Sequence, residues 1–273
     1  MTVQRATPQE VDVPRTATGR PGAPISRLPE ATPPADAAWS RWERRLYRAG
    51  DAGLPYRLLC PTPGVPGDPW PLVIFLHGAG ERGNDNEKQL VHGMSDLASD
   101  DVRWRFPAFV VAPQCPADEQ WVDTPWTEPS HTMPEQPSLA MRLTLDLIQY
   151  LCDELPVDRR RLYVTGLSMG GFGVWDALQR HSDWFAAAAP VCGGGDVALA
   201  SRIKDVPVWI FHGDEDPVVL PQRSRDMVAA LQAAGGRPRY TEYSRTGHHS
   251  WVLAYAQREL YAWMFAQRRG EPR

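Results

Sequence analysis

The chain has 273 residues, of which 42% are apolar, and its 29 Lys and Arg against 33 Asp and Glu give a formal net charge of −4. This length suits one large α/β domain with a sizeable core. The slightly acidic balance argues against a nucleic-acid-binding surface, which is usually a clustered basic patch, and no apolar run is long enough for a membrane-spanning helix.

The first 36 residues are rich in Pro, Thr, Ala and Gly and hold few large apolar side chains. Such a segment buries too little surface to offset its ordering entropy, so we predict a flexible tail over 1–36 and one folded domain over 37–273. The stretch from Met1 to Pro24 contains no apolar run like the core of a signal peptide. The sequence therefore predicts a cytoplasmic protein with reduced cysteines.

Predicted strands and helices alternate along the rest of the chain. Short apolar runs predict strands over 56–59, 72–76, 109–112, 162–165, 185–191, 208–211 and 240–243. Apolar spacing predicts helices over 139–155, 172–180, 224–234 and 251–268. The segment 139–155 also alternates like a strand, but it is long, lacks β-branched residues and has Ser138 as an N-cap. This order predicts a mainly parallel central sheet with helices on both faces.

Residues 166–170 read Gly-Leu-Ser-Met-Gly and match the pattern G-x-S-x-G. In this pattern the serine occupies a sharp turn between a strand and a helix, where a side chain at either glycine position would clash. A predicted strand precedes the motif and a predicted helix follows it. The alternative is a glycine-rich turn whose serine has no catalytic role. The strand before the motif and the helix after it favour Ser168 as a nucleophile at the carboxyl edge of the sheet.

A glycine-rich loop follows the predicted strand over 72–76 and reads His-Gly-Ala-Gly-Glu-Arg-Gly over 77–83. Backbone N–H groups in such a loop can bind the negative oxygen that develops during acyl transfer. We assign the first donor to Ala79, with Gly78 as the alternative, and the second to Met169, which follows the candidate nucleophile. A phosphate-binding loop is disfavoured because no G-K-[ST] follows.

Candidate acids and bases follow the later strands. Asp214 and Asp216 come after the predicted strand over 208–211, and His248 and His249 precede the last predicted helix. A nucleophile, an acid and a base in this chain order form a known arrangement of hydrolase triads, in which the histidine takes the serine proton and the carboxylate orients the histidine. The residues alone leave both choices open, with Asp214 held in reserve behind Asp216.

Other histidines and tryptophans have less specific settings. His77 and His212 lie in turns at the ends of predicted strands, where we expect structural roles. Trp121, Trp126 and Trp251 are candidate pocket walls for an organic substrate. Packing under the long excursion predicted over 113–137 is an equal alternative for these three indoles.

Several segments occur in an order that is similar to one family. They are residues 77–83, 112–116, 166–171, 211–213 with Asp216, and 247–248 with Trp251. Together they resemble bacterial esterases of the dienelactone-hydrolase and prolyl-oligopeptidase-like branch of the α/β-hydrolases, often described as phospholipase/carboxylesterase-like or polyhydroxybutyrate-depolymerase-like. The resemblance covers residues 45–268 and implies the three-layer α/β-hydrolase fold. In that family the acid lies three residues past the His-Gly pair and the base directly follows a glycine, which selects Asp216 and His248.

The resemblance implies a cofactor-free serine hydrolase whose Ser168, Asp216 and His248 cleave a carboxylic ester through an acyl-enzyme. We expect a small-molecule ester substrate, no metal, no nucleic acid and no membrane partner, and leave homo-oligomerisation open. A serine peptidase acting on short peptides is the alternative, because the same triad cleaves amides. A binding protein on an inactive scaffold is disfavoured, because all three triad residues are present.

Overall fold

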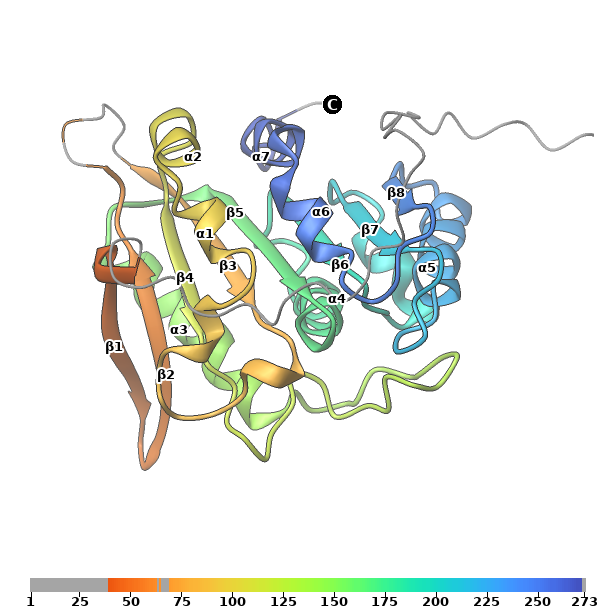
Figure 1. Cartoon of the computed structure of the whole chain (residues 1–273), viewed down its shortest axis with the longest axis horizontal. Coiled ribbons are helices and arrows are strands. Elements are labelled where there is room, and N and C mark those ends of the chain that lie inside the picture. Colours follow the sequence, from red (N-terminus) through yellow and green to blue (C-terminus); the bar gives the residue numbers. More distant parts are fainter. Residues whose placement is uncertain (1–38, 63, 65–68, 272–273) are drawn as a thin grey trace, which may run out of the picture.

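The computed structural model describes residues 39–62, 64 and 69–271 (Figure 1). The tail predicted over 1–36 lies outside the described residues, so the division of the chain into tail and domain stays a prediction. The described residues form one eight-stranded sheet in the order β1-β2-β4-β3-β5-β6-β7-β8. No helix in this part of the chain is long and apolar enough to cross a membrane.

The strands are β1 (Trp42–Ala49), β2 (Ala52–Leu59), β3 (Trp70–Leu76), β4 (Phe109–Pro113), β5 (Val157–Leu167), β6 (Ala187–Val191), β7 (Trp209–Gly213) and β8 (Arg239–Tyr243). The α-helices are α1 (Met94–Leu97), α2 (Asp100–Arg105), α3 (Leu139–Glu154), α4 (Met169–Arg180), α5 (Gln222–Ala233), α6 (Trp251–Ala256) and α7 (Arg258–Phe265). Four short 3₁₀ helices are η1 (Trp39–Arg41), η2 (Ala79–Glu81), η3 (Lys88–Leu90) and η4 (Val197–Ile203).

The sheet is antiparallel at one edge and parallel elsewhere. β1 and β2 form a hairpin that joins β4 antiparallel, and the other strand pairs are parallel. One core, on the α3, α4 and α5 face, includes Trp175, and the other, on the α1, α2, α6 and α7 face, includes Tyr255 (Figure 1). The predicted three-layer fold, with a mainly parallel sheet between helices, is confirmed.

The elements that the apolar runs predicted are present, with boundaries shifted by a few residues. Ser138 caps α3 by accepting a hydrogen bond from the Met141 amide at 3.1 Å, as its position before the helix predicts. The sequence did not indicate β1, because it is an edge strand that buries only Trp42 fully and carries four charged side chains along its length. The short helices α1 and α2 were not predicted either.

The prediction of a single closing helix over 251–268 is wrong. The helix breaks at Gln257, whose backbone is extended (φ −77°, ψ 113°). At about 100° per residue, Leu260 would lie on the opposite side of a continuous helix from Trp251. The break lets both side chains enter the same core, where each is almost fully buried.

Candidate active site

Ser168 lies in a strained turn between β5 and α4. Its backbone has φ 54° and ψ −119°, which non-glycine residues rarely adopt. A Cβ at Gly166 would lie 2.6 Å from the Leu76 carbonyl oxygen, and a Cβ at Gly170 would lie only 1.9 Å from it. The two glycines of the motif are therefore required by the close approach of β3 to the turn, as the sequence pattern predicted.

Gly170→Ala is expected to lower the free energy of unfolding by about 3 kcal/mol or more, because β3 would have to move to admit the methyl group. Gly80→Ala is the matched control, since a Cβ there would meet nothing within 4 Å. Urea denaturation of both variants measures the difference. Equal stability of the two variants would contradict the close packing of this turn.

Three side chains from separate loops meet at the carboxyl edge of the sheet. Ser168 Oγ lies 2.9 Å from His248 Nε2, and His248 Nδ1 lies 2.7 Å from Asp216 Oδ2. Because an ionised carboxylate only accepts, Nδ1 carries the proton and Nε2 is free to accept the serine proton. The structure thus brings together all three predicted triad residues in the order serine, imidazole, carboxylate.

Asp216 is buried, with 3% of the residue exposed, and is surrounded by donors. Its Oδ1 accepts from the amides of Val218 at 2.9 Å and Val219 at 3.0 Å. Burial alone would raise the pKa of its carboxyl, but hydrogen bonds from His212 and His248 outweigh burial and hold that pKa well below its usual range. The carboxylate is therefore ionised, and its orientation is fixed.

The alternative acid and base have other contacts. Asp214 accepts a hydrogen bond from the Thr246 amide at 3.3 Å, so its carboxylate supports the backbone of the loop that carries His248. His249 is exposed, and its ring centroid lies 4.8 Å from that of Trp251. The structure joins Asp216 and His248, rather than these two neighbours, to Ser168.

The two predicted oxyanion donors begin short helical segments. Ala79 is the first residue of η2 and Met169 the first residue of α4, so each amide precedes the first intrahelical hydrogen bond. The loop packs directly on the turn of the nucleophile, because a Cβ at Gly78 would lie 2.9 Å from Leu167 Cδ1. Both amides therefore lie in segments that adjoin Ser168.

His77 holds the peptide that carries the Ala79 amide. Its Nδ1 lies 2.6 Å from the carbonyl oxygen of Gly78, and its Nε2 lies 2.9 Å from the Cys115 amide nitrogen. A carbonyl only accepts and an amide only donates, so these partners fix the neutral Nδ1–H tautomer. Trp121 supports the same turn by donating its indole N–H to the His77 carbonyl oxygen at 2.9 Å. The structural role predicted for His77 is confirmed.

Burial lowers the pKa of the His77 imidazole to about 4, while an unfolded histidine titrates near 6.5. The unfolded state therefore binds a proton first, and stability that is present above about pH 6.5 is lost as the pH falls towards 4. Between pH 7 and pH 4.5, the free energy of unfolding should fall by about 2 kcal/mol less in His77→Gln than in the wild type. Denaturation at both pH values measures it, with the exposed His249→Gln as control; equal losses in all three proteins would contradict the assignment.

The side chains that follow Ala79 brace the loop from two directions. Glu81 is largely buried, and its Oε1 lies 3.5 Å from His92 Nε2. Arg82 donates from Nε to the Ala79 carbonyl oxygen at 2.9 Å and from a terminal nitrogen to the Glu119 carbonyl oxygen at 3.3 Å. The peptides on both sides of Ala79 are thereby anchored.

The predicted pocket walls differ in their settings. The indole of Trp251 lies edge-on to the His248 ring at 5.2 Å between centroids, and only 6% of the residue is exposed. Trp126 is partly buried and packs against the core on the α3 and α4 face. Trp251 therefore packs beside the base as part of the core, Trp121 is fully buried, and a role of these indoles in a substrate pocket stays a prediction.

The long segment between β4 and α3, residues 114–138, crosses the α4 and α5 side of the sheet and is held by buried polar groups. Arg180 of α4 donates to the Pro134 carbonyl oxygen at 2.7 Å, and Arg223 of α5 donates to the Glu128 carbonyl oxygen at 2.8 Å. The ordered excursion predicted in this region is therefore confirmed, although it contains no helix or strand.

Cys192 is a neighbour of the triad that sequence reasoning missed. It follows β6 with φ 40° and is fully buried. Its Sγ, a carboxylate oxygen of Asp216 and a ring nitrogen of His248 all lie within 4.8 Å of one another. The His248 nitrogen and the Asp216 oxygen hydrogen-bond each other, which is the geometry of a catalytic triad. Cys192 could have been found from its position directly after the strand next to β5, because the carboxyl ends of parallel strands share one edge of the sheet.

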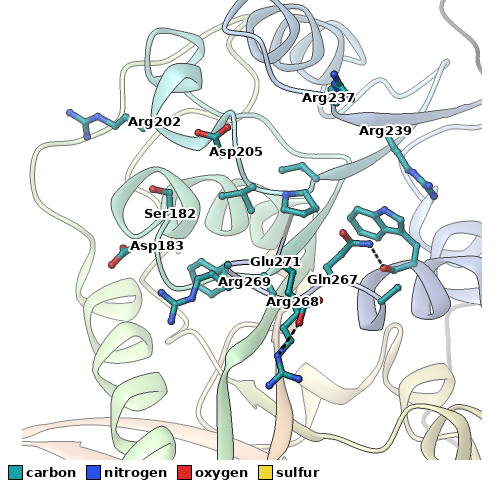
Figure 2. A pocket seen from close by; sticks show the side chains of 18 residues that line it. Ser182, Asp183, Arg202, Asp205, Arg237, Arg239, Gln267, Arg268, Arg269 and Glu271 are labelled. Carbon is teal, nitrogen blue, oxygen red and sulfur yellow. Dashed lines mark hydrogen bonds and ion pairs between the residues drawn. The ribbon is translucent and has the colours of Figure 1, made fainter. Parts of the chain in front are cut away.

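A large hollow of the described surface lies away from the triad. Figure 2 shows this cavity of about 660 Å³, whose lining includes Ala186, Val208 and Arg237, residues that precede β6, β7 and β8. It therefore lies at the amino edge of the sheet, opposite Ser168. Its arginines fan out around the rim, and Arg268 pairs with Glu271 at 3.6 Å (Figure 2).

Comparisons with known proteins agree with this fold. The model of the prolyl oligopeptidase family matches residues 144–206, which include Ser168. The crystal structure of a thermostable esterase is 39% identical with a TM-score of 0.79, covering 85% of this chain and 64% of that one. NocK of Nocardia uniformis subsp. tsuyamanensis, which is named as an esterase, is 29% identical over 193 residues, covering 69% of this chain and 52% of NocK.

A protein of Oryza sativa subsp. japonica described as an inactive carboxylesterase is 27% identical over 203 residues, covering 68% of this chain and 82% of that protein. The chain thus spans about half the length of NocK and about two thirds of the thermostable esterase. The fold and the linked serine, histidine and aspartate define an α/β-hydrolase. Within that class, residues 144–206 are similar to the prolyl oligopeptidase family.

Proposed function

We propose that the protein hydrolyses carboxylic esters through an acyl-enzyme formed on Ser168. The observation that carries this proposal is the unbroken chain of hydrogen bonds from Ser168 Oγ through His248 to Asp216, at 2.9 Å and 2.7 Å. The esterases among its relatives support an ester as the bond that is cleaved. The proposed partner is a small-molecule ester.

The proposed reaction follows from the roles of these atoms. His248 Nε2 takes the hydroxyl proton as Ser168 Oγ attacks the ester carbonyl, and Asp216 stabilises the imidazolium that forms. The amides of Ala79 and Met169 donate to the oxyanion of the tetrahedral intermediate. His248 then gives the proton to the leaving alcohol, and water repeats the sequence to release the acid.

A serine peptidase is the second candidate. The prolyl oligopeptidase family model favours it, but the matched residues 144–206 carry the nucleophile turn, which both activities use. The same triad geometry cleaves esters and amides, so the reaction class is set by the site and the substrate by its surroundings.

Hydrolysis of a p-nitrophenyl ester series, from acetate to long acyl chains, against peptide p-nitroanilides tests the proposal. We expect ester turnover that is lost in Ser168→Ala, with little or no turnover of the anilides. The chain-length profile would size the acyl pocket. Anilide turnover above that of every ester would replace the esterase with the peptidase.

A further inference from the structure

A second histidine contacts the acid of the triad. His212 lies near the end of β7, and none of its surface is exposed. Its Nε2 lies 2.9 Å from the Val219 carbonyl oxygen and 3.2 Å from Asp216 Oδ2. Its Nδ1 lies 2.7 Å from Ser224 Oγ of α5. The ring therefore fills the inside of the loop that carries the acid and joins this loop to α5.

The partners of His212 fix the location of its proton. A carbonyl oxygen and an ionised carboxylate only accept, so Nε2 carries a hydrogen that faces both Val219 O and Asp216 Oδ2. Ser224 can donate to Nδ1, and its Oγ also lies 3.4 Å from the Gly193 carbonyl oxygen. Whether or not Nδ1 is protonated, this network keeps the Nε2 hydrogen directed at the acid.

Asp216 Oδ2 consequently faces two imidazole N–H groups, from His248 at 2.7 Å and from His212 at 3.2 Å. A hydrogen bond to the charged form of a carboxylate stabilises that form and makes the oxygen a weaker base. A less basic Asp216 stabilises the protonated His248 ring less. Without the donor from His212, Asp216 would bind the protonated His248 ring more strongly.

We propose that His212 is a positioning residue for the acid, whose Nε2–H shares Oδ2 with His248 and so limits how strongly Asp216 stabilises the protonated base. This inference rests on the proposed function, because it assigns His212 a part in the same triad. The hydrogen-bond and ion-pair partners of His212 in the described part of the chain are Ser224, Val219 and Asp216, and not the nucleophile.

Other ionisable groups also face this cluster. They are the buried thiol of Cys192 after β6, Glu242 on β8, Asp214 on the acid loop, and His249 beside the base. Oδ2 accepts from His248 and His212, whereas these four groups act on the cluster at longer range. They stay unchanged when His212 is replaced, so the effect of one N–H on the acid can be isolated.

Two substitutions separate the two ends of the ring. His212→Asn places an amide near Nδ1, where it reaches Ser224 but loses the donor to Asp216. His212→Gln places an amide N–H near Nε2 and keeps that donor. We expect the midpoint of the acid limb of kcat/KM for p-nitrophenyl acetate to move up by about half a pH unit or more in His212→Asn. In His212→Gln it should stay close to that of the wild type.

Acid limbs that coincide in all three proteins, with only Tm lowered in the variants, would reduce His212 to a packing residue and overturn the proposal. If His212→Asn does not fold, ¹⁵N NMR of the histidine rings in the wild type decides: a protonated Nε2 on His212 is expected, and an unprotonated Nε2 would overturn it. If the wild type hydrolyses no ester, the proposed function fails separately. The pH dependence of fluorophosphonate labelling of Ser168 then provides the same comparison.

Discussion

Ser168→Ala is expected to lower kcat for ester hydrolysis by about 10⁶, because the variant has no atom that can form the acyl-enzyme. The base and the acid would remain hydrogen-bonded to each other, since their 2.7 Å contact does not involve the serine. Initial rates on p-nitrophenyl acetate, with circular dichroism as a check on folding, measure the effect.

Ser182→Ala is the matched control for this substitution. Ser182 lines the hollow at the opposite edge of the sheet (Figure 2), so its loss should leave kcat within about twofold. Turnover by Ser168→Ala near that of the wild type would place the nucleophile elsewhere.

Asp216→Asn should lower kcat by about 10⁴ while the fold is retained. The asparagine oxygen would keep the two amide donors of Val218 and Val219, which turns its NH₂ group towards His248. An NH₂ group only donates, so Nδ1 would lose its proton and Nε2 would carry it. The ring could then no longer accept the proton of Ser168.

Asp214→Asn tests the choice between the two acids of the loop. Its carboxylate accepts only from the Thr246 amide in the described part of the chain, and an asparagine oxygen can take over that bond. We expect kcat within a few fold of the wild type, measured on the same ester. A loss of activity in Asp214→Asn that matches the loss in Asp216→Asn would contradict the assignment of the acid.

The fold was largely predictable because parallel strands buried on both faces appear in the sequence as continuous apolar runs. The runs over 72–76 and 162–165 are apolar at nearly every position, and both became central strands. The polar hairpin strand β1 has no such apolar run, because its stability comes from pairing with β2. The break at Gln257 could not be predicted from the sequence either, because its position depends on where the surface of the sheet lies in the folded protein.

The site was predictable where local backbone geometry decides it. Gly166 and Gly170 mark the turn of Ser168, because only glycine fits there beside β3. The residues alone could not choose between Asp214 and Asp216, because that choice depends on the path of the loop. The place of Cys192 beside the acid depends on strand order, which brings β6 and β7 next to each other. The place of His212 depends on the path of the loop after β7, which turns Asp216 back towards it.

Labelling of the wild-type protein with a fluorophosphonate, followed by intact mass and peptide mapping, tests the central claim most directly. The reagent phosphonylates a serine only where a base activates it and donors hold the developing oxyanion. We predict one adduct per chain, located on Ser168, with labelling abolished in Ser168→Ala and strongly slowed in Asp216→Asn. No adduct, or an adduct on another residue, would contradict the assignment of Ser168, His248 and Asp216 as the catalytic triad.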